Sequence, residues 1–199
     1  MSTQRRRVLE NAGISDGVYI EGLDGKAYTV DKWQGGNAAN SVIVASGDVK
    51  FRIALTQPSS MAIGSRTDPL DNYMTAISNQ TAAKADYNGS GNTANILKVR
   101  PSTEYAAGYC NSFVFPDGKT KGFLPSLGQL NLAYQNKAAV DAALSKCGGT
   151  AMSTEYYWSS TFWGVGGSRR RCWGLGWSDG DVGILGLNYN GYVRPFAAY

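Results

Sequence analysis

The side chains that most often carry catalysis are scarce in this chain. It contains no histidine, which excludes Ser-His-Asp and Cys-His nucleophiles and removes the commonest general base. Cys110, Cys147 and Cys172 are odd in number and widely spaced, a pattern that favours reduced, mostly buried thiols over a disulfide framework or a zinc site. No constellation of carboxylates, tyrosines and lysines stands out. The sequence therefore indicates a non-enzymatic protein that uses neither a metal nor a cofactor.

Two arginine clusters account for much of the net charge of +4. Because the positive charge is local and the body of the chain is near neutral, nucleic acid is disfavoured as the main partner. Arg5 to Arg7 suit a solvated tail, with docking onto a larger assembly as the alternative. Arg169 to Arg171 suit a solvated loop or a contact with an anionic ligand equally well, since guanidinium groups bind carboxylates and phosphates bidentately.

The length of 199 residues suits one large domain. We expect a tail over residues 1–16 and a domain over 17–199, with a β-rich part at 17–60. The basic start is not followed by an apolar stretch, so we expect synthesis in a cytoplasm without a signal peptide and no insertion into a membrane.

Residues 17–60 have the pattern of a hairpin-rich β region. The turn signals Asp24-Gly25 and Ser46-Gly47-Asp48 separate runs of β-branched and aromatic residues. These runs cover residues 18–20, 27–30, 42–44 and 51–55.

Two or three short helices are expected in the middle of the chain. Leu70, Tyr73, Met74 and Ile77 form a helical stripe behind a cap at Asp68, ending before the polar loop 86–91. After a turn at residues 115–119, Ser126 begins a second helix and residues 137–146 form a third, which ends at Gly148-Gly149.

Residues 155–199 lack helical periodicity and are predicted to be strand and loop throughout. From Phe162 to Gly191 the chain has nine glycines and three tryptophans but no Lys, Glu, Gln, Met, Pro, Ala, Thr or His. Trp173, Leu175 and Trp177 alternate with small residues, so one strand face should pack inward and the other should face solvent.

Several landmarks in this region resemble the variable proteins of diversity-generating retroelements, including phage tropism determinants. They are Tyr157-Trp158-Ser159-Ser160-Thr161, Cys172-Trp173, Trp177-x-x-Gly180 and residues 192–199, with residues 122–130 upstream. The resemblance covers about residues 70–199, and residues 17–29 resemble the N-terminal part of phage and Bacteroides members. It implies an α+β, C-type-lectin-like fold of antiparallel strands, two or three short helices and long Gly-rich loops.

The resemblance also implies that reverse transcription mutates adenines at set codons within a variable region, here residues 155–199. An Asn codon ending in a pyrimidine cannot become Lys, Glu, Gln, Met or Trp, and the first four are absent from residues 162–191. Trp163 departs from this rule and needs another codon. Counted between the landmarks, the implied ligand-binding positions are Phe162, Trp163, Gly164, Val165, Ser168, Arg169, Gly174, Gly176, Ser178, Asp179, Asp181, Gly183, Ile184, Leu185, Asn188, Tyr189, Asn190 and Gly191.

The large residues in this region have two interpretations. The landmarks Trp158, Trp173 and Trp177 suit core packing better than ligand contact. By contrast, the apolar pairs 162–163 and 184–185 lie in Gly-rich stretches and suit an exposed patch of binding anchors better than core packing. Calcium-binding motifs of the lectin type are absent, and residues 177–179 match one of them only in part.

The leading hypothesis is a hypervariable adhesin on a phage tail fibre that binds a protein or glycan receptor on a bacterial surface. The resemblance is compatible with a homotrimer or with attachment to a tail fibre. The alternative is a ligand-binding protein of the same family displayed on a bacterial cell surface. A formylglycine-generating enzyme ranks third, because that activity uses a close pair of C-terminal cysteines and only Cys172 lies there.

Overall fold

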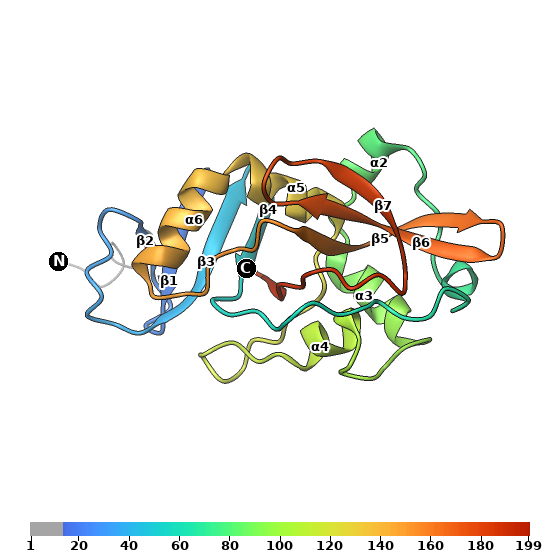
Figure 1. The fold of residues 1–199 in the computed structure, drawn as a ribbon. Coiled ribbons are helices and arrows are strands. Elements are labelled where there is room, and N and C mark those ends of the chain that lie inside the picture. Colours follow the sequence, from blue (N-terminus) through green and yellow to red (C-terminus); the bar gives the residue numbers. More distant parts are fainter. Residues whose placement is uncertain (1–13) are drawn as a thin grey trace.

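Two antiparallel sheets organise residues 14–199, which are the residues that the computed structural model describes (Figure 1). With the helices they make a mixed α+β fold, as the sequence predicts. The first sheet has the order β2-β1-β3-β4-β8 and the second the order β5-β6-β7. Their strands are β1 (Gly17–Gly22), β2 (Ala27–Thr29), β3 (Ala39–Ser46), β4 (Val49–Ile53), β5 (Tyr156–Gly166), β6 (Arg169–Gly176), β7 (Val182–Gly186) and β8 (Phe196–Ala198).

The first sheet joins the two ends of the described chain. Its hairpins turn at Gly25 and Gly47, with φ of 74° and 56°, which confirms both predicted turns. The last strand, β8, pairs with β4. Arg52 in β4 pairs with the buried Glu21 at 2.8 Å and also donates to the carbonyl of Ala198. The N-terminal β region and the C-terminal segment therefore share one sheet.

Between β4 and β5 the described chain forms five α-helices and one 3-10 turn. They are η1 (Leu70–Asn72), α2 (Gln80–Lys84), α3 (Gly89–Leu97), α4 (Ala106–Ser112), α5 (Leu127–Gln135) and α6 (Lys137–Lys146). The last two confirm the helices predicted after Ser126 and over 137–146. The Ser126 amide donates to Gln129 Oε1 at 3.0 Å in a capping box. Gly148, at a φ of 72°, follows the end of α6.

The helix predicted behind Asp68 is wrong. Only residues 70–72 form a helical turn, and it is a 3-10 turn. The Asp68 carboxylate instead accepts the Ser65 amide and pairs with Arg100. Helix α2 lies inside the predicted range, which ends before residue 86, but α3 and α4 were not expected, and five helices replace the predicted two or three.

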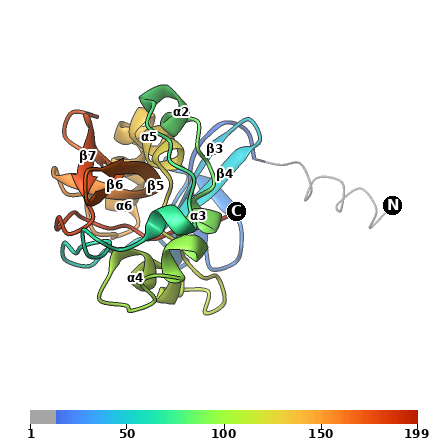
Figure 2. The same cartoon turned by 90° about the vertical axis from the view of Figure 1, so that its right-hand side faces the viewer.

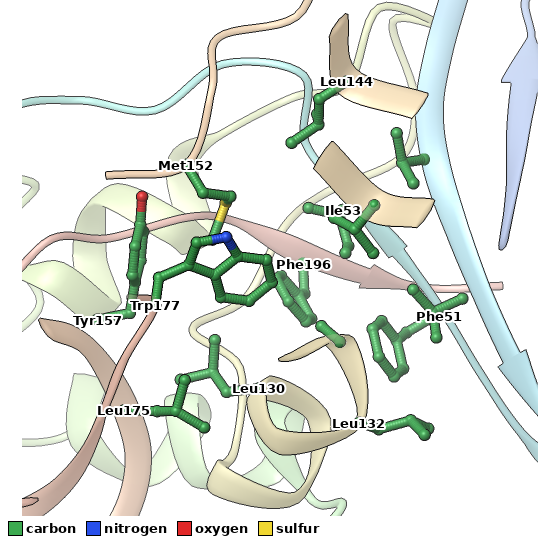
Figure 3. Packing of buried hydrophobic residues seen from close by; sticks show 14 of the residues in the cluster. Phe51, Ile53, Leu130, Leu132, Leu144, Met152, Tyr157, Leu175, Trp177 and Phe196 are labelled. Carbon is green, nitrogen blue, oxygen red and sulfur yellow. The ribbon is translucent and has the colours of Figure 1, made fainter. Parts of the chain in front are cut away.

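One core connects the second sheet to the first. Tyr157 of β5, Leu175 of β6 and Trp177, which follows β6, lie in one buried cluster with Leu130 of α5, and Leu175 is beside Leu130 (Figure 3). The same cluster continues through α6 to the first sheet, with Leu144, Ile53, Phe51 and Phe196 among its members. The second sheet is thereby fixed to the rest of the fold along one face.

The second sheet lies on one side of α5 and the strands β3 and β4 on the other (Figure 2). The β5–β6 hairpin points away from the first sheet (Figure 1), and β7 is the outer strand. On the opposite edge, Tyr157 of β5 forms a parallel bridge with Tyr192. The hairpin tip and β7 are the parts of this sheet that are least covered by the fold.

Candidate ligand-binding face

A hollow of about 560 Å³ lies beside the β5–β6 hairpin and the loop that follows β7. This volume falls in the range of small-molecule sites, about 300–1,000 Å³. Five of its eight lining residues belong to the implied ligand-binding positions. The lining consists of Arg66, Arg169, Arg171, Ile184, Gly186, Asn188, Tyr189 and Asn190.

The alternation of side chains along β6 sorts its three arginines. Arg169 and Arg171 line the hollow. Arg170, between them, faces away, and its Nε donates to Asp71 Oδ1 at 2.8 Å. The Arg171 guanidinium lies 5.6 Å from the centre of the Trp163 ring, a cation–π contact that holds it in place. Trp163 therefore acts on the hollow through Arg171.

Arg66 forms the facing wall and comes from a distant segment of the chain. Its Nε donates to Asn188 Oδ1 at 2.7 Å, and its carbonyl accepts the Arg170 amide at 3.0 Å. The amides of Ile63 and Gly64 both donate to the Leu187 carbonyl at 3.0 Å. Backbone bonds thus fix residues 61–66 against the second sheet. Sequence reasoning missed Arg66 because no local pattern connects it to residues 169–191.

The loop at residues 188–191 is held from beneath by Trp158. The indole Nε1 donates to the carbonyls of Met61 and Tyr189 at 3.0 and 3.3 Å. A Cβ on Gly191 would come within 3.0 Å of the indole ring, so the backbone packs closely there. Trp158 is fully buried, whereas the Tyr189 ring is 42% exposed. The landmark tryptophan is core, as predicted, and it supports an exposed aromatic side chain.

A second group of implied positions lies at the other end of the sheet. Strand β6 separates Ser178, Asp179 and Asp181 from the hairpin tip, and its eight residues span roughly 25 Å at about 3.3 Å per residue. The Tyr156 hydroxyl donates to Asp181, which raises the pKa of Tyr156 to about 12. The implied positions at residues 178–181 therefore lie apart from those that line the hollow.

Phe162 is not part of an exposed patch, contrary to the sequence prediction. It is 1% exposed and packs in a buried cluster with Trp158 and Cys172. The register of β5 against β6 shifts on both sides of Phe162, and such irregularities re-aim side chains. Among the other predicted binding anchors, Ile184 is exposed, at 40%, whereas Trp163 and Leu185 are half-buried.

The small residues that alternate with Trp173, Leu175 and Trp177 were expected on a solvent-facing side of the strand, and this is wrong for the glycines of β6. Gly174 and Gly176 are both buried. A Cβ on Gly174 would lie 2.7 Å from Leu185 Cδ1, and one on Gly176 would lie 2.9 Å from Asp179 Oδ1. Gly183 is similarly close, at 3.0 Å, to the ring of Tyr156. At the hairpin tip, Gly164 is buried at a φ of 136°, whereas Val165 and Ser168 are exposed.

The cysteines agree with the prediction of mostly buried thiols. All three are free, Cys110 and Cys172 are fully buried, and Cys147 is half-buried. Burial raises the pKa of the Cys110 and Cys172 thiols, which keeps them protonated. Within residues 14–199, no three acidic or cysteine side chains are grouped so that they could hold a metal ion.

Comparison with known proteins gives no relative from which to transfer a function. No protein-family model, no curated protein and no solved structure matches the chain. In the part of the chain that the structure describes, no helix is long and apolar enough to cross a membrane. The function must therefore be argued from the hollow and the residues that hold it.

Proposed function

We propose that this protein is a hypervariable ligand-binding module with a C-type-lectin-like fold, diversified by adenine-directed mutagenesis and carried on a phage tail fibre. Its target would be a receptor on the surface of a host bacterium. One observation carries the proposal: five implied variable positions line a single hollow. They are Arg169, Ile184, Asn188, Tyr189 and Asn190.

The support beneath the hollow favours this role. The landmarks Trp158, Trp173 and Trp177 are all buried. Each indole N–H has a partner, the Trp173 group donating to the Ile77 carbonyl at 2.7 Å and the Trp177 group to Asp141 Oδ1 at 3.1 Å. Rigid supports of this kind let exposed side chains change while the backbone keeps its position.

The DNA that flanks the gene tests the diversification. We expect a near-copy of codons 155–199 beside a reverse transcriptase gene, with the two copies differing only where the near-copy has adenine. The codons of Arg169, Ile184 and Tyr189 should be among the differing ones, and those of Asn188 and Asn190 should align with adenine-containing Asn codons in the near-copy. A near-copy that differs at other bases, or the lack of a copy, would contradict the proposal.

Binding to cells tests the location of the site. Labelled protein is screened against a panel of bacterial isolates, and a strain that binds it is used to compare two variants. Tyr189→Ala removes an exposed ring from the hollow, whereas Tyr73→Ala removes an equally exposed ring that does not line it. We expect only Tyr189→Ala to weaken binding. Equal loss in both variants would place the site elsewhere.

A further inference from the structure

The hollow contains uncompensated positive charge. Arg66, Arg169 and Arg171 line it, and none of its lining residues is acidic. Four ion pairs are present among residues 14–199, and none involves these three arginines. The nearby Asp71 is already paired with Arg170 on the other face of β6. Three guanidinium groups therefore face one space without a carboxylate of this part of the chain to balance them.

Two of these arginines are held in place by contacts that leave donors free. Arg66 uses its Nε for Asn188, so its terminal nitrogens remain. Arg171 is held by the Trp163 ring, and this contact uses none of its N–H groups. A guanidinium held by other contacts loses less rotamer freedom when it binds an anion, and its planar donors match the two oxygens of a carboxylate or phosphate.

The rest of the lining suits a sugar that carries the anion. Asn190 adds amide donors and acceptors, which pair with hydroxyl groups. Tyr189 and Ile184 add exposed apolar surface at 42% and 40%. The three arginines surround a single hollow, whereas nucleic-acid binding uses a longer track of phosphate contacts. The lining therefore favours an acidic saccharide over a nucleic acid.

We propose that the hollow binds the anionic groups, carboxylate or phosphate, of an acidic bacterial surface glycan, with Arg66, Arg169 and Arg171 as the recognition residues. This inference rests on the proposed function and names the ligand class of the same site. A repeating acidic polymer offers the same group many times, so several copies of the protein on one particle would bind it with high avidity.

The test measures binding of the whole protein to four immobilised polymers: polygalacturonate for carboxylate, wall teichoic acid for phosphate, dextran as a neutral glycan and oligothymidylate as a nucleic acid. Arg171→Gln and Arg66→Gln each remove one charge from the hollow. Arg170→Gln is the matched control, because it removes the same charge from the same strand on the opposite face. Thermal melts of all three variants establish that they are folded.

We expect polygalacturonate, teichoic acid or both to bind, with binding weakened by added salt. Arg171→Gln and Arg66→Gln should each weaken it about tenfold or more, the usual effect of losing a charged hydrogen bond, and Arg170→Gln should change it by less than about twofold. The acidic polymer that binds identifies the anion. Dextran or oligothymidylate binding as tightly, no binding to either acidic polymer, or an equal loss with Arg170→Gln would each overturn the proposal.

The two proposals fail in different ways. If Tyr189→Ala abolishes cell binding and the adenine-specific near-copy is found, but Arg171→Gln has no effect, the diversified binder stands and the acidic ligand falls. If the acidic polymer binds through Arg171 and no near-copy exists, the anion site stands and the diversification falls.

Discussion

Replacing Phe162 by alanine should destabilise the fold far more than replacing Ile184, although the resemblance implies that both are ligand-binding positions. Phe162 is 1% exposed inside a closed cluster, and Phe→Ala changes at such sites cost about 3–5 kcal/mol. Ile184 is 40% exposed on the outer strand. Removing its three outer carbons, about 60% buried at roughly 0.8 kcal/mol each, should cost about 1.4 kcal/mol.

Urea unfolding followed by tryptophan fluorescence measures both changes, since the chain has five tryptophans. With a slope of about 2 kcal/mol per molar, the midpoint should fall by about 1.5–2.5 M for Phe162→Ala and by about 0.7 M for Ile184→Ala. The slope itself should stay unchanged. Equal midpoint shifts, or a shift below about 0.5 M for Phe162→Ala, would refute the division into a buried scaffold and an exposed binding face.

Three further outcomes follow from buried groups. Burial opposes ionisation of Glu21, but hydrogen bonds led by the one from Arg52 outweigh it and lower the pKa of Glu21 below 4.5. The stability that ionised Glu21 gives the fold is therefore fully present above about pH 4.5. It is lost as the pH falls through the lowered pKa of the folded state. Glu21→Gln should cost about 3 kcal/mol at pH 7 and flatten the fall in melting temperature below pH 4.5. Gly180→Ala should lower stability by about 2 kcal/mol in the same urea assay, because φ is 75° and a Cβ would meet an aromatic ring at 2.3 Å. In the folded protein, Cys110 and Cys172 should resist a thiol reagent that modifies them in denaturant, and rapid native labelling of either would contradict their burial.

The elements that the sequence predicts well are those with a local signal at one end. The predicted bounds of α6 agree with the observed ones because Gly148-Gly149 ends it, and Ser126 predicts the start of α5. The hairpins of the first sheet follow from Asp24-Gly25 and Gly47. These signals act within a few residues, so one chain is enough to read them.

The sequence does not predict helix α3 because its first glycine has a long-range cause. Gly89 begins the helix in a segment that reads as a polar loop. A Cβ there would lie 2.2 Å from Gln129 Oε1 and 2.9 Å from the Ser126 amide nitrogen. The glycine is required where α3 meets the start of α5, and not to make the chain turn. No local pattern distinguishes these two reasons.

The apolar stripe after Asp68 misled for a related reason. Leu70 and Met74 are buried in the cluster that contains Phe162, but Tyr73 is 44% exposed. Tyr73 and Met74 donate their amides to the Leu70 carbonyl and close one turn, but Ile77 donates to the Phe162 carbonyl, so the segment bonds to β5 beyond that turn. An irregular segment that runs along a sheet can also bury residues spaced three and four apart. Such a sequence shows the helical period although the segment is not a helix.

The candidate site depends on the same kind of long-range information. Strand alternation alone would place Arg169 and Arg171 together and Arg170 opposite, once residues 169–176 are known to be a strand. The charge that remains at the hollow depends on the segment at residues 61–72, which supplies Arg66 to one face of β6 and Asp71 to the other. Asp71 neutralises the central arginine and leaves the outer two uncompensated beside a third. Three consecutive arginines that suit a solvated loop or an anionic-ligand contact equally well in the sequence therefore become, in the fold, one ion pair with Asp71 and two residues that line the hollow.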